Sequence, residues 1–303
     1  MTGLSSPDSH DCPDREAWER AVRPGLDRLA TVSPVGGRGW CVGAACILEA
    51  SAPKPGNVHP GAAFADLAHD DLVAAAVAIA PSMERAAEAP LGRTILEAVA
   101  AAAAVTRSNA NLGIVLAIAP LAAAGEPDRV SEPLARLTAA DAADVWRAIA
   151  VARPGGMGTA ARHDLNAPPP TDLLAAMREA ADRDQIARLW ATGYGDLFHG
   201  PVVDLPAEMA AGFGLQDAIV RTHLRQLARE PDSLIVRRHG ADVAAAVSRQ
   251  ARAALAAGPA WRLATAAFDR TLRHPRRVNP GTLADLVAAA LYILLRQRRI
   301  RLP

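Results

Sequence analysis

Residues 171–192 have the sequence TDLLAAMREAADRDQIARLWAT. The apolar residues Leu173, Leu174, Met177, Ala180 and Ala181 recur at the spacing that places side chains on one face of an α-helix. Alternation of apolar and polar residues with a period of two, which indicates a half-buried strand, is nearly absent from the rest of the chain. We therefore predict an all-α fold.

The same helical pattern recurs along the chain between short loops rich in glycine, proline and asparagine. It predicts helices near residues 15–31, 40–51, 70–89, 92–106, 111–124, 138–151, 171–192, 206–229, 240–256, 259–273 and 281–298. We find neither an internal repeat nor a linker long enough to divide the chain. Residues 14–303 are therefore predicted to form a single compact domain of about ten helices. Residues 1–13 are polar and are expected to form a flexible N-terminal arm.

The composition excludes several classes of function. The 303 residues are 50% hydrophobic, enough for a sizeable core, and their formal net charge of +1 provides no large field to hold a nucleic acid. The longest apolar run, 112–124, is too short to span a bilayer and contains Pro120. The cysteines Cys12, Cys41 and Cys46 form no regular framework, which indicates a reducing compartment. We expect a cytoplasmic protein without nucleic-acid or membrane partners.

Lys54 is the only lysine in a chain whose other cationic side chains are arginine and histidine. It lies in the segment SAPKPGNVH, residues 51–59, where prolines stiffen the loop and Gly56 permits backbone conformations closed to other residues. Lysine is a compact charge that suits a tight phosphate site. The segment predicts that Lys54 and Gly56 bind phosphate, and the alternative is an incidental surface lysine.

Four loops lead into predicted helices with small or asparagine residues: 55–57, 108–113, 154–158 and 279–282. Helix N-termini offer free N–H groups and the positive end of the helix dipole, so they bind anions. Their recurrence favours a phosphate-rich ligand contacted by Asn57, Asn109, Asn111 and Gly113. Asparagine is also a common helix N-cap, and this alternative remains open for each loop.

Acidic residues lie near the same loops. Glu49 precedes Lys54, Asp66 and Asp70 follow it, and Asp184 flanks Arg183 together with Asp182 in the predicted helix 171–192. Since Mg²⁺ prefers carboxylate oxygens and bridges phosphates, we predict that Glu49, Asp66, Asp70 and Asp184 hold Mg²⁺. A solvated helix face also accounts for each acid taken alone, and Asp285 is interpreted as compensating a helix dipole. There is no Walker lysine loop and no dinucleotide fingerprint after a strand.

In this order, these segments resemble the triphosphoribosyl-dephospho-CoA synthase family. Residues 49–58, EASAPKPGNV, are similar to that family's Glu…Pro-Lys-Pro-Gly-x-Val segment. The resemblance extends over about residues 40–295, through segments 64–72, 106–113, 152–158, 181–184, 231–238 and 280–286. This resemblance identifies the chain as a divergent member of the family.

The resemblance implies an all-helical, Mg²⁺-dependent pentosyltransferase. An acceptor hydroxyl, in the best-known case that of 3′-dephospho-CoA, attacks C1 of the ATP ribose; adenine leaves, and the triphosphate stays on the transferred sugar. The matched segments add Arg183, Arg237 and Arg238 to the expected phosphate contacts, and Asp66, Asp70 and Asp182 are candidates for the general base. The family also suggests a homodimer.

The chain departs from the family pattern at several positions. Asn109-Ala110-Asn111-Leu112 replaces Asn-Thr-His-Lys, Arg238 stands where lysine is common, and Asn57-Val58 replaces Leu-Val. These differences leave open a second acceptor, a ribitol-bearing precursor of a methanopterin-type one-carbon carrier, with the same transfer chemistry. A further alternative is a helical nucleotide-binding protein without turnover.

Overall fold

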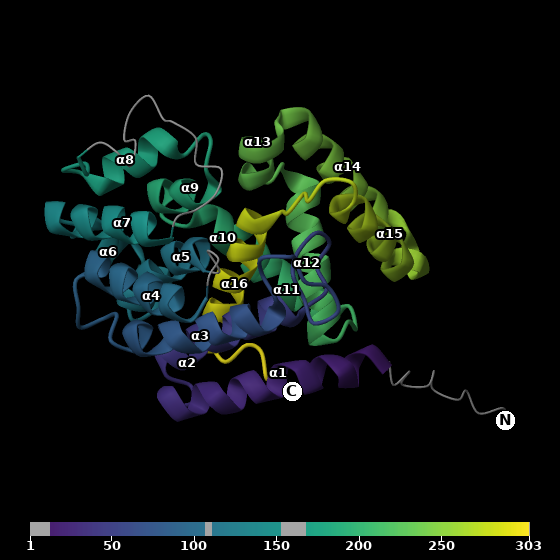
Figure 1. Cartoon of the computed structure of the whole chain (residues 1–303), viewed down its shortest axis with the longest axis horizontal. Coiled ribbons are helices and arrows are strands. Elements are labelled where there is room, and N and C mark those ends of the chain that lie inside the picture. Colours follow the sequence, from purple (N-terminus) through teal and green to yellow (C-terminus); the bar gives the residue numbers. More distant parts are fainter. Residues whose placement is uncertain (1–12, 107–110, 153–167, 303) are drawn as a thin grey trace.

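Helices dominate the computed structural model, which describes residues 13–106, 111–152 and 168–302 (Figure 1). The only β-structure in these ranges is two isolated bridges, His59–Ala62 and Phe64–Leu67. The sixteen α-helices and two 3-10 helices there are α1 Pro13–Val32, α2 Arg38–Ser51, α3 His69–Glu84, α4 Leu91–Val105, α5 Leu112–Ala123, η1 Pro127–Arg129, α6 Ser131–Ala135, α7 Ala139–Ala152, α8 Leu173–Ala180, α9 Gln185–Thr192, α10 Gly195–His199, α11 Pro201–Ala210, α12 Leu215–Arg229, α13 Ser233–His239, α14 Ala241–Ala256, η2 Gly258–Ala260, α15 Trp261–Arg273 and α16 Gly281–Arg296. The predicted all-α fold is confirmed, but the predicted number of about ten helices is too low.

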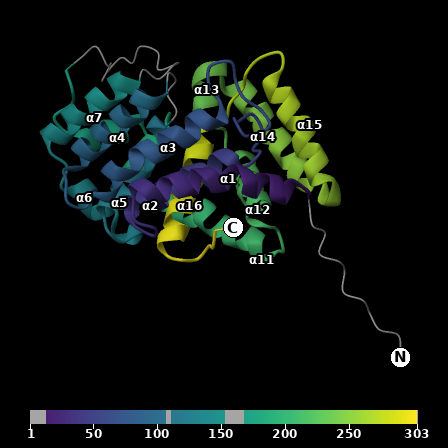
Figure 2. The same cartoon turned by 60° about the horizontal axis from the view of Figure 1, so that its bottom comes forward.

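Three helices, α2, α5 and α16, form the buried centre of the protein. Nearly every residue of each is buried. A helix that is apolar on all sides has no face for water, so neighbouring helices pack around it. Figure 1 shows α16 in the middle, with α4–α9 on one side and α11–α15 on the other. Figure 2 shows α1 running across both groups, packed on α2 and α3.

A proline inside α5 connects this buried helix to its neighbours. Pro120 has no N–H group, so the carbonyl of Leu116 loses its usual partner within the helix. The indole Nε1 of Trp190 in α9 donates to that carbonyl at 2.9 Å, and the hydroxyl of Tyr194 donates to the carbonyl of Ala117, also at 2.9 Å. Trp190 and Tyr194 are both buried. The proline therefore fixes the position of α9 against α5 without leaving a buried carbonyl unsatisfied.

Two long predicted helices are each broken in the structure. The predicted helix 171–192 is divided into α8 and α9, because the carboxylate of Asp184 caps α9 by accepting the N–H groups of Ile186 and Ala187. The predicted helix 206–229 is interrupted before α12, where Gly212 has a positive φ of 93°. The short helices α6, α10 and α13 were not predicted, because segments of five to seven residues carry little periodicity.

One buried apolar cluster connects α1 to α16 and includes residues from Trp18 to Ile300. The predicted flexible arm, 1–13, lies almost wholly outside the described residues, since α1 begins at Pro13. The prediction of a single domain stays a prediction. Among the described residues, no helix combines the length and the hydropathy needed to cross a membrane.

The buried His223 of α12 should make the stability of the fold sensitive to acid. The side chain is fully buried, and its Nε2 lies 3.4 Å from the carbonyl of Pro280, just before α16. Burial, followed by the charge of Lys54, lowers the pKa of His223 from 6.5 to about 3. The unfolded chain therefore binds a proton that the folded chain does not, and the free energy of unfolding falls as the pH drops from 6.5 towards 3.

We expect a His223→Gln variant to lose stability less steeply than the wild type in that pH window, by up to about 1.4 kcal/mol per pH unit. Urea denaturation at a series of pH values measures the difference in slope. His59 and His69, whose pKa values are also lowered by burial, remain in both proteins and act as a common background. Parallel stability curves for the two proteins would contradict the assignment.

Candidate active site

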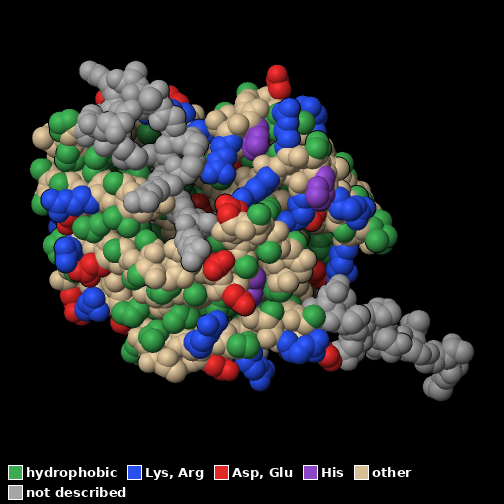
Figure 3. All heavy atoms as spheres, in the orientation of Figure 1, with side chains coloured by type: hydrophobic (Ala, Val, Ile, Leu, Met, Phe, Trp, Pro, Cys, Tyr) green, Lys and Arg blue, Asp and Glu red, His purple; other side chains and the backbone are tan. Residues whose placement is uncertain are grey.

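A cleft of about 1480 Å³ opens where the end of α2 meets the starts of α5, α9 and α16, beside α13. Figure 3 shows basic and acidic side chains gathered near the middle of this face of the molecule. The charged residues that line the cleft are Glu49, Asp66, Arg183, Asp184, Arg237, Arg238, Arg277 and Asp285. Such a mixture suits a ligand that carries phosphates together with a cation.

Asp285, in the first turns of α16, lies against the start of α5. A β-carbon built on Gly113 would lie 1.9 Å from Oδ2 of Asp285, so this close approach requires glycine at position 113. Asp285 is partly buried, and it makes no hydrogen bond or ion pair with any described residue. Burial raises the pKa of Asp285 well above its usual value, and the charges of Glu49, Asp232 and Asp184 raise it further.

Lys54 is fully buried and does not line the cleft. Its Nζ lies 2.9 Å from Oε1 of Glu49, and it donates to the carbonyls of Glu49 and of Ala52, the latter at 3.2 Å. The ammonium group thus has three partners within the chain, which matches its three protons. Glu49 does line the cleft, so Lys54 holds a carboxylate of the site in place. Direct phosphate binding by Lys54 stays a prediction.

Four arginines form the cationic wall of the cleft, namely Arg183, Arg237, Arg238 and Arg277. Arg237 pairs with Asp184 at 2.8 Å; Arg277 pairs with Asp66 and stacks 3.6 Å from the ring centroid of Phe64. Burial, followed by the charges of Arg277 and Arg237, lowers the pKa of Arg238. These cations repel one another, and a bound anion would relieve the repulsion.

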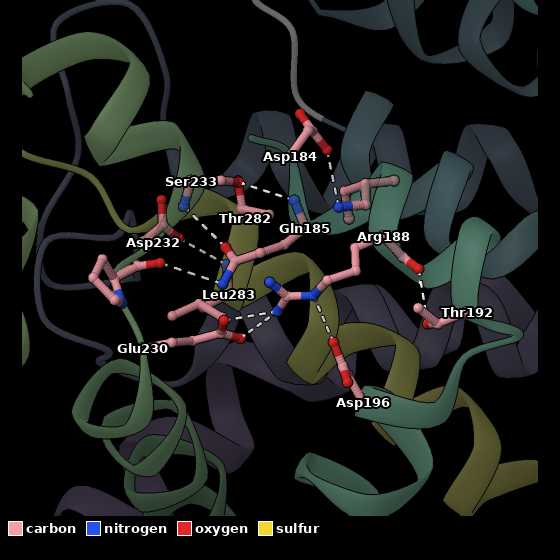
Figure 4. Close-up of polar contacts among 12 residues, drawn as sticks. Asp184, Gln185, Arg188, Thr192, Asp196, Glu230, Asp232, Ser233, Thr282 and Leu283 are labelled. Atoms are coloured by element: carbon pink, nitrogen blue, oxygen red, sulfur yellow. Dashed lines mark hydrogen bonds and ion pairs between the residues drawn. The ribbon is translucent and has the colours of Figure 1, made fainter. Parts of the chain in front are cut away.

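A buried network fixes the elements that carry these charges (Figure 4). The fully buried carboxylate of Asp232 accepts the N–H of Ile235 at 3.0 Å and that of Leu283 in α16 at 2.8 Å. The side chain of Gln185 in α9 accepts the N–H of Ser233 at 2.9 Å. Burial raises the pKa of Asp232 to about 6, although its backbone hydrogen bonds oppose the shift. The starts of α9, α13 and α16 are therefore held together.

Two asparagines present unsatisfied groups among the cleft-lining residues. Nδ2 of Asn111 and Oδ1 of Asn279 are buried, and neither has a hydrogen-bond partner within the described part of the chain. Asn111 is the N-cap of α5, but its side chain makes no capping bond. The capping interpretation is therefore wrong for Asn111. A ligand that accepts from Asn111 and donates to Asn279 would satisfy both groups.

The structure gathers most, but not all, of the predicted site residues. Glu49, Asn57, Asp66, Asn111, Gly113, Arg183, Asp184, Arg237 and Arg238 line the cleft. Lys54, Gly56, Asp70 and Asp182 do not, and Asn109 lies outside the described residues. The side chain of Asp70 is 99% exposed beside His69, and Asp182 is exposed between α8 and α9.

Gly56 has a structural role in the conformation of its loop. It has a positive φ of 75°, and its N–H donates to the carboxylate of Asp269 in α15 at 2.8 Å. The predicted metal ligands are not clustered: the described residues contain no group of three or more His, Cys, Asp or Glu side chains that could hold a metal ion.

Asp285, Asn279 and Arg277 also line the cleft, but they are not among the site residues predicted from the sequence. A signal for Asp285 was present, because its segment 280–286 and the Gly113 segment both match the family pattern. A position in the first turns of a helix, taken alone, gives no reason to expect that the carboxyl lies against Gly113. Only the packing of α16 against α5 brings the two residues together.

The family model described as ATP:dephospho-CoA triphosphoribosyl transferase matches residues 38–302. The chain belongs to this family. Membership confirms the predicted ribosyl-transferring activity on 3′-dephospho-CoA, and neither alternative function gains support. The homodimer and the cytoplasmic location stay predictions.

A solved structure also resembles the chain. The crystal structure of a putative triphosphoribosyl-dephospho-CoA synthase from Archaeoglobus fulgidus has a TM-score of 0.59 and 21% sequence identity, and the match covers 74% of this chain and 98% of that one. At this identity the likeness shows a shared fold. No curated protein matches the chain.

The buried Lys54–Glu49 pair predicts a large effect on stability. Replacing Lys54 with methionine leaves the Glu49 carboxylate without its charged partner, and breaking a buried pair in this way costs about 3–5 kcal/mol. We expect a loss of this size in the free energy of unfolding of Lys54→Met, measured by urea denaturation. Lys54→Arg should not restore stability, because the enclosed site offers no partners for a guanidinium's two extra donors.

The double variant Glu49→Gln, Lys54→Met is the matched control, since it removes both charges. It should recover most of the stability lost in Lys54→Met. A Lys54→Met protein as stable as the wild type would contradict the pairing.

Proposed function

We propose that this chain uses the cleft to transfer the 5-triphosphoribosyl group of ATP to a hydroxyl of 3′-dephospho-CoA, releasing adenine. The observation that carries the assignment is the position of Asp285. Its carboxyl, which has no hydrogen bond or ion pair with any described residue, lies against Gly113 in the same cleft as the four arginines. A carboxylate near the reacting sugar and a cationic wall for the triphosphate are the two requirements of this chemistry.

The arginines support triphosphate binding. Arg183, Arg237, Arg238 and Arg277 line one cleft, and the planar guanidinium group donates hydrogen bonds to phosphate oxygens in pairs. The start of α5 adds the positive end of a helix dipole beside Asn111. Together these groups would hold the triphosphate and fix the sugar relative to Asp285.

Asp285 is the best-placed general base among the described carboxylates of the cleft. Glu49, Asp66 and Asp184 are each ion-paired, with Lys54, Arg277 and Arg237 respectively. Asp285 has no such pair among the described residues, so its carboxylate is left to accept a proton. It would take the proton of the acceptor hydroxyl while the hydroxyl oxygen forms a bond to C1 of the ribose. The bond from C1 to adenine N9 breaks, its electron pair stays on adenine, and adenine takes up a proton.

Carboxylates in the cleft also fit Mg²⁺. The charges of Glu49 and Asp184 both raise the pKa of Asp285, so both acids lie near enough to Asp285 for their charges to affect it. Mg²⁺ usually binds through one or two carboxylates together with substrate phosphates, so it needs no larger cluster of protein ligands. Glu49 and Asp184 would hold the ion, which would neutralise part of the triphosphate charge and help to orient it.

Replacing Asp285 with asparagine tests the assignment. Asparagine keeps the shape of the side chain but cannot take a proton, so we expect the rate of adenine release from ATP and dephospho-CoA to fall about 10²–10⁴-fold. The KM for ATP should change little. Chromatography measures adenine, and circular dichroism checks the fold.

Asp70→Asn and Asp182→Asn serve as controls, since both acids were candidates from the sequence and neither lines the cleft. Both should retain activity. If either variant loses activity while Asp285→Asn keeps it, the base has been assigned to the wrong residue. If the wild type forms ADP or AMP without adenine, the proposed reaction itself is wrong.

Removal of divalent cations tests the proposed metal. We expect EDTA to abolish adenine release and Mg²⁺ to restore it, because the triphosphate and the cleft carboxylates need a cation between them. Zn²⁺ should not substitute, since the described cleft lining offers no set of Cys and His ligands. Undiminished turnover in metal-free buffer would remove the metal from the mechanism.

A further inference from the structure

The cleft extends beyond its charged part into an apolar lobe between α4, α7 and α8. This lobe is lined by Val99, Ala103, Trp146, Ile149, Ala176 and Met177. In Figure 1, α7 and α8 lie on one side of α9 and α16, and α13, which carries Arg237 and Arg238, lies on the other. Residues of both parts line the same cleft, so the charged part and the lobe are continuous.

The size of the cleft indicates two ligands. A pocket for one drug-sized molecule usually measures about 300–1,000 Å³. The cleft measures about 1480 Å³, and a transfer reaction requires donor and acceptor to be bound side by side. The charged part suits the triphosphate of ATP, so the lobe is available to a less polar part of one of the two substrates.

We propose that the apolar lobe binds the uncharged pantetheine arm of the acceptor, a subsite that rests on the proposed function. Apart from Trp146 and Thr106 at its edge, the described lining of the lobe is aliphatic. Burying phosphates there would cost the solvation of their charges. The pantetheine arm brings methyl, methylene and thiol groups, whose burial is favourable, and because the lobe is part of an open cleft, its two amides and its hydroxyl group can keep hydrogen bonds with water.

The adenine of ATP fits the lobe less well than the arm does. When the bond to C1 breaks, adenine carries developing negative charge and needs hydrogen-bond donors around its ring nitrogens. Aliphatic side chains donate no hydrogen bonds, whereas the charged part of the cleft offers arginines and Nδ2 of Asn111, which has no partner among the described residues. Adenine therefore belongs nearer the charged part, and the lobe belongs to the acceptor.

Ala103 and Ala104 of α4 provide a matched pair of test sites. Both are exposed alanines on the same helix, but only Ala103 lines the cleft. Because both side chains are exposed, a tryptophan is tolerated at either position without disturbing the core. In Ala103→Trp the indole would occupy the lobe, and in Ala104→Trp it would not.

The experiment measures KM for each substrate by adenine release, and the dissociation constant for dephospho-CoA by titration calorimetry. We expect Ala103→Trp to raise both the KM and the dissociation constant for dephospho-CoA about tenfold or more, while the KM for ATP stays near the wild-type value. Binding of ADP, which lacks the arm, should not change. Ala104→Trp should match the wild type in every measurement.

A rise in the KM for ATP with no change for dephospho-CoA would overturn the proposal, because it would place adenine in the lobe. Equal values for Ala103→Trp and wild type would overturn it as well. Since calorimetry needs no turnover, the lobe is tested even if the wild type releases no adenine. That result would count against the proposed function alone.

Discussion

The hydrogen bonds of the buried Asp232 carboxylate are the constraint on which the cleft depends. One oxygen accepts the N–H of Ile235 and caps α13, and the other accepts the N–H of Leu283 in α16. Burying a carboxylate is unfavourable unless the group is fully hydrogen-bonded. Separating the two helix starts would break one of these hydrogen bonds and leave a buried carboxylate oxygen without a partner. Arg237 and Arg238 lie on the first of these helices and Asp285 on the second.

The charges of the cleft follow from this arrangement. Three of its carboxylates are neutralised by Lys54, Arg277 and Arg237, whereas Asp285 faces Gly113 without a partner among the described residues. The buried Lys54 serves the site indirectly, because it holds Glu49 at the edge of the cleft. Paired acids can then bind and orient ligands, while the unpaired acid is left to accept a proton.

The sequence predicts the fold better than it predicts the site. Apolar helices such as α5 and α16 are evident because their composition requires burial, but the break at Asp184 depends on a cap that competes with a continuous helical pattern. The single lysine lies beside Glu49, which lines the cleft. Its burial against Glu49 is not visible in the spacing, because it depends on how the loop after α2 turns back. Asp285 and Asn279 become site residues only through contacts between distant segments.

The central claim is that the sugar and the whole triphosphate of ATP move together to the acceptor, held by one cationic wall. ATP radiolabelled at the γ-phosphate tests it most directly, with the enzyme, Mg²⁺ and dephospho-CoA in the same reaction. The account predicts that the label appears on the dephospho-CoA product in amounts equal to the adenine released, and that mass spectrometry finds the mass of one added triphosphoribosyl group. Label recovered as free phosphate or pyrophosphate, with unmodified dephospho-CoA, would contradict it.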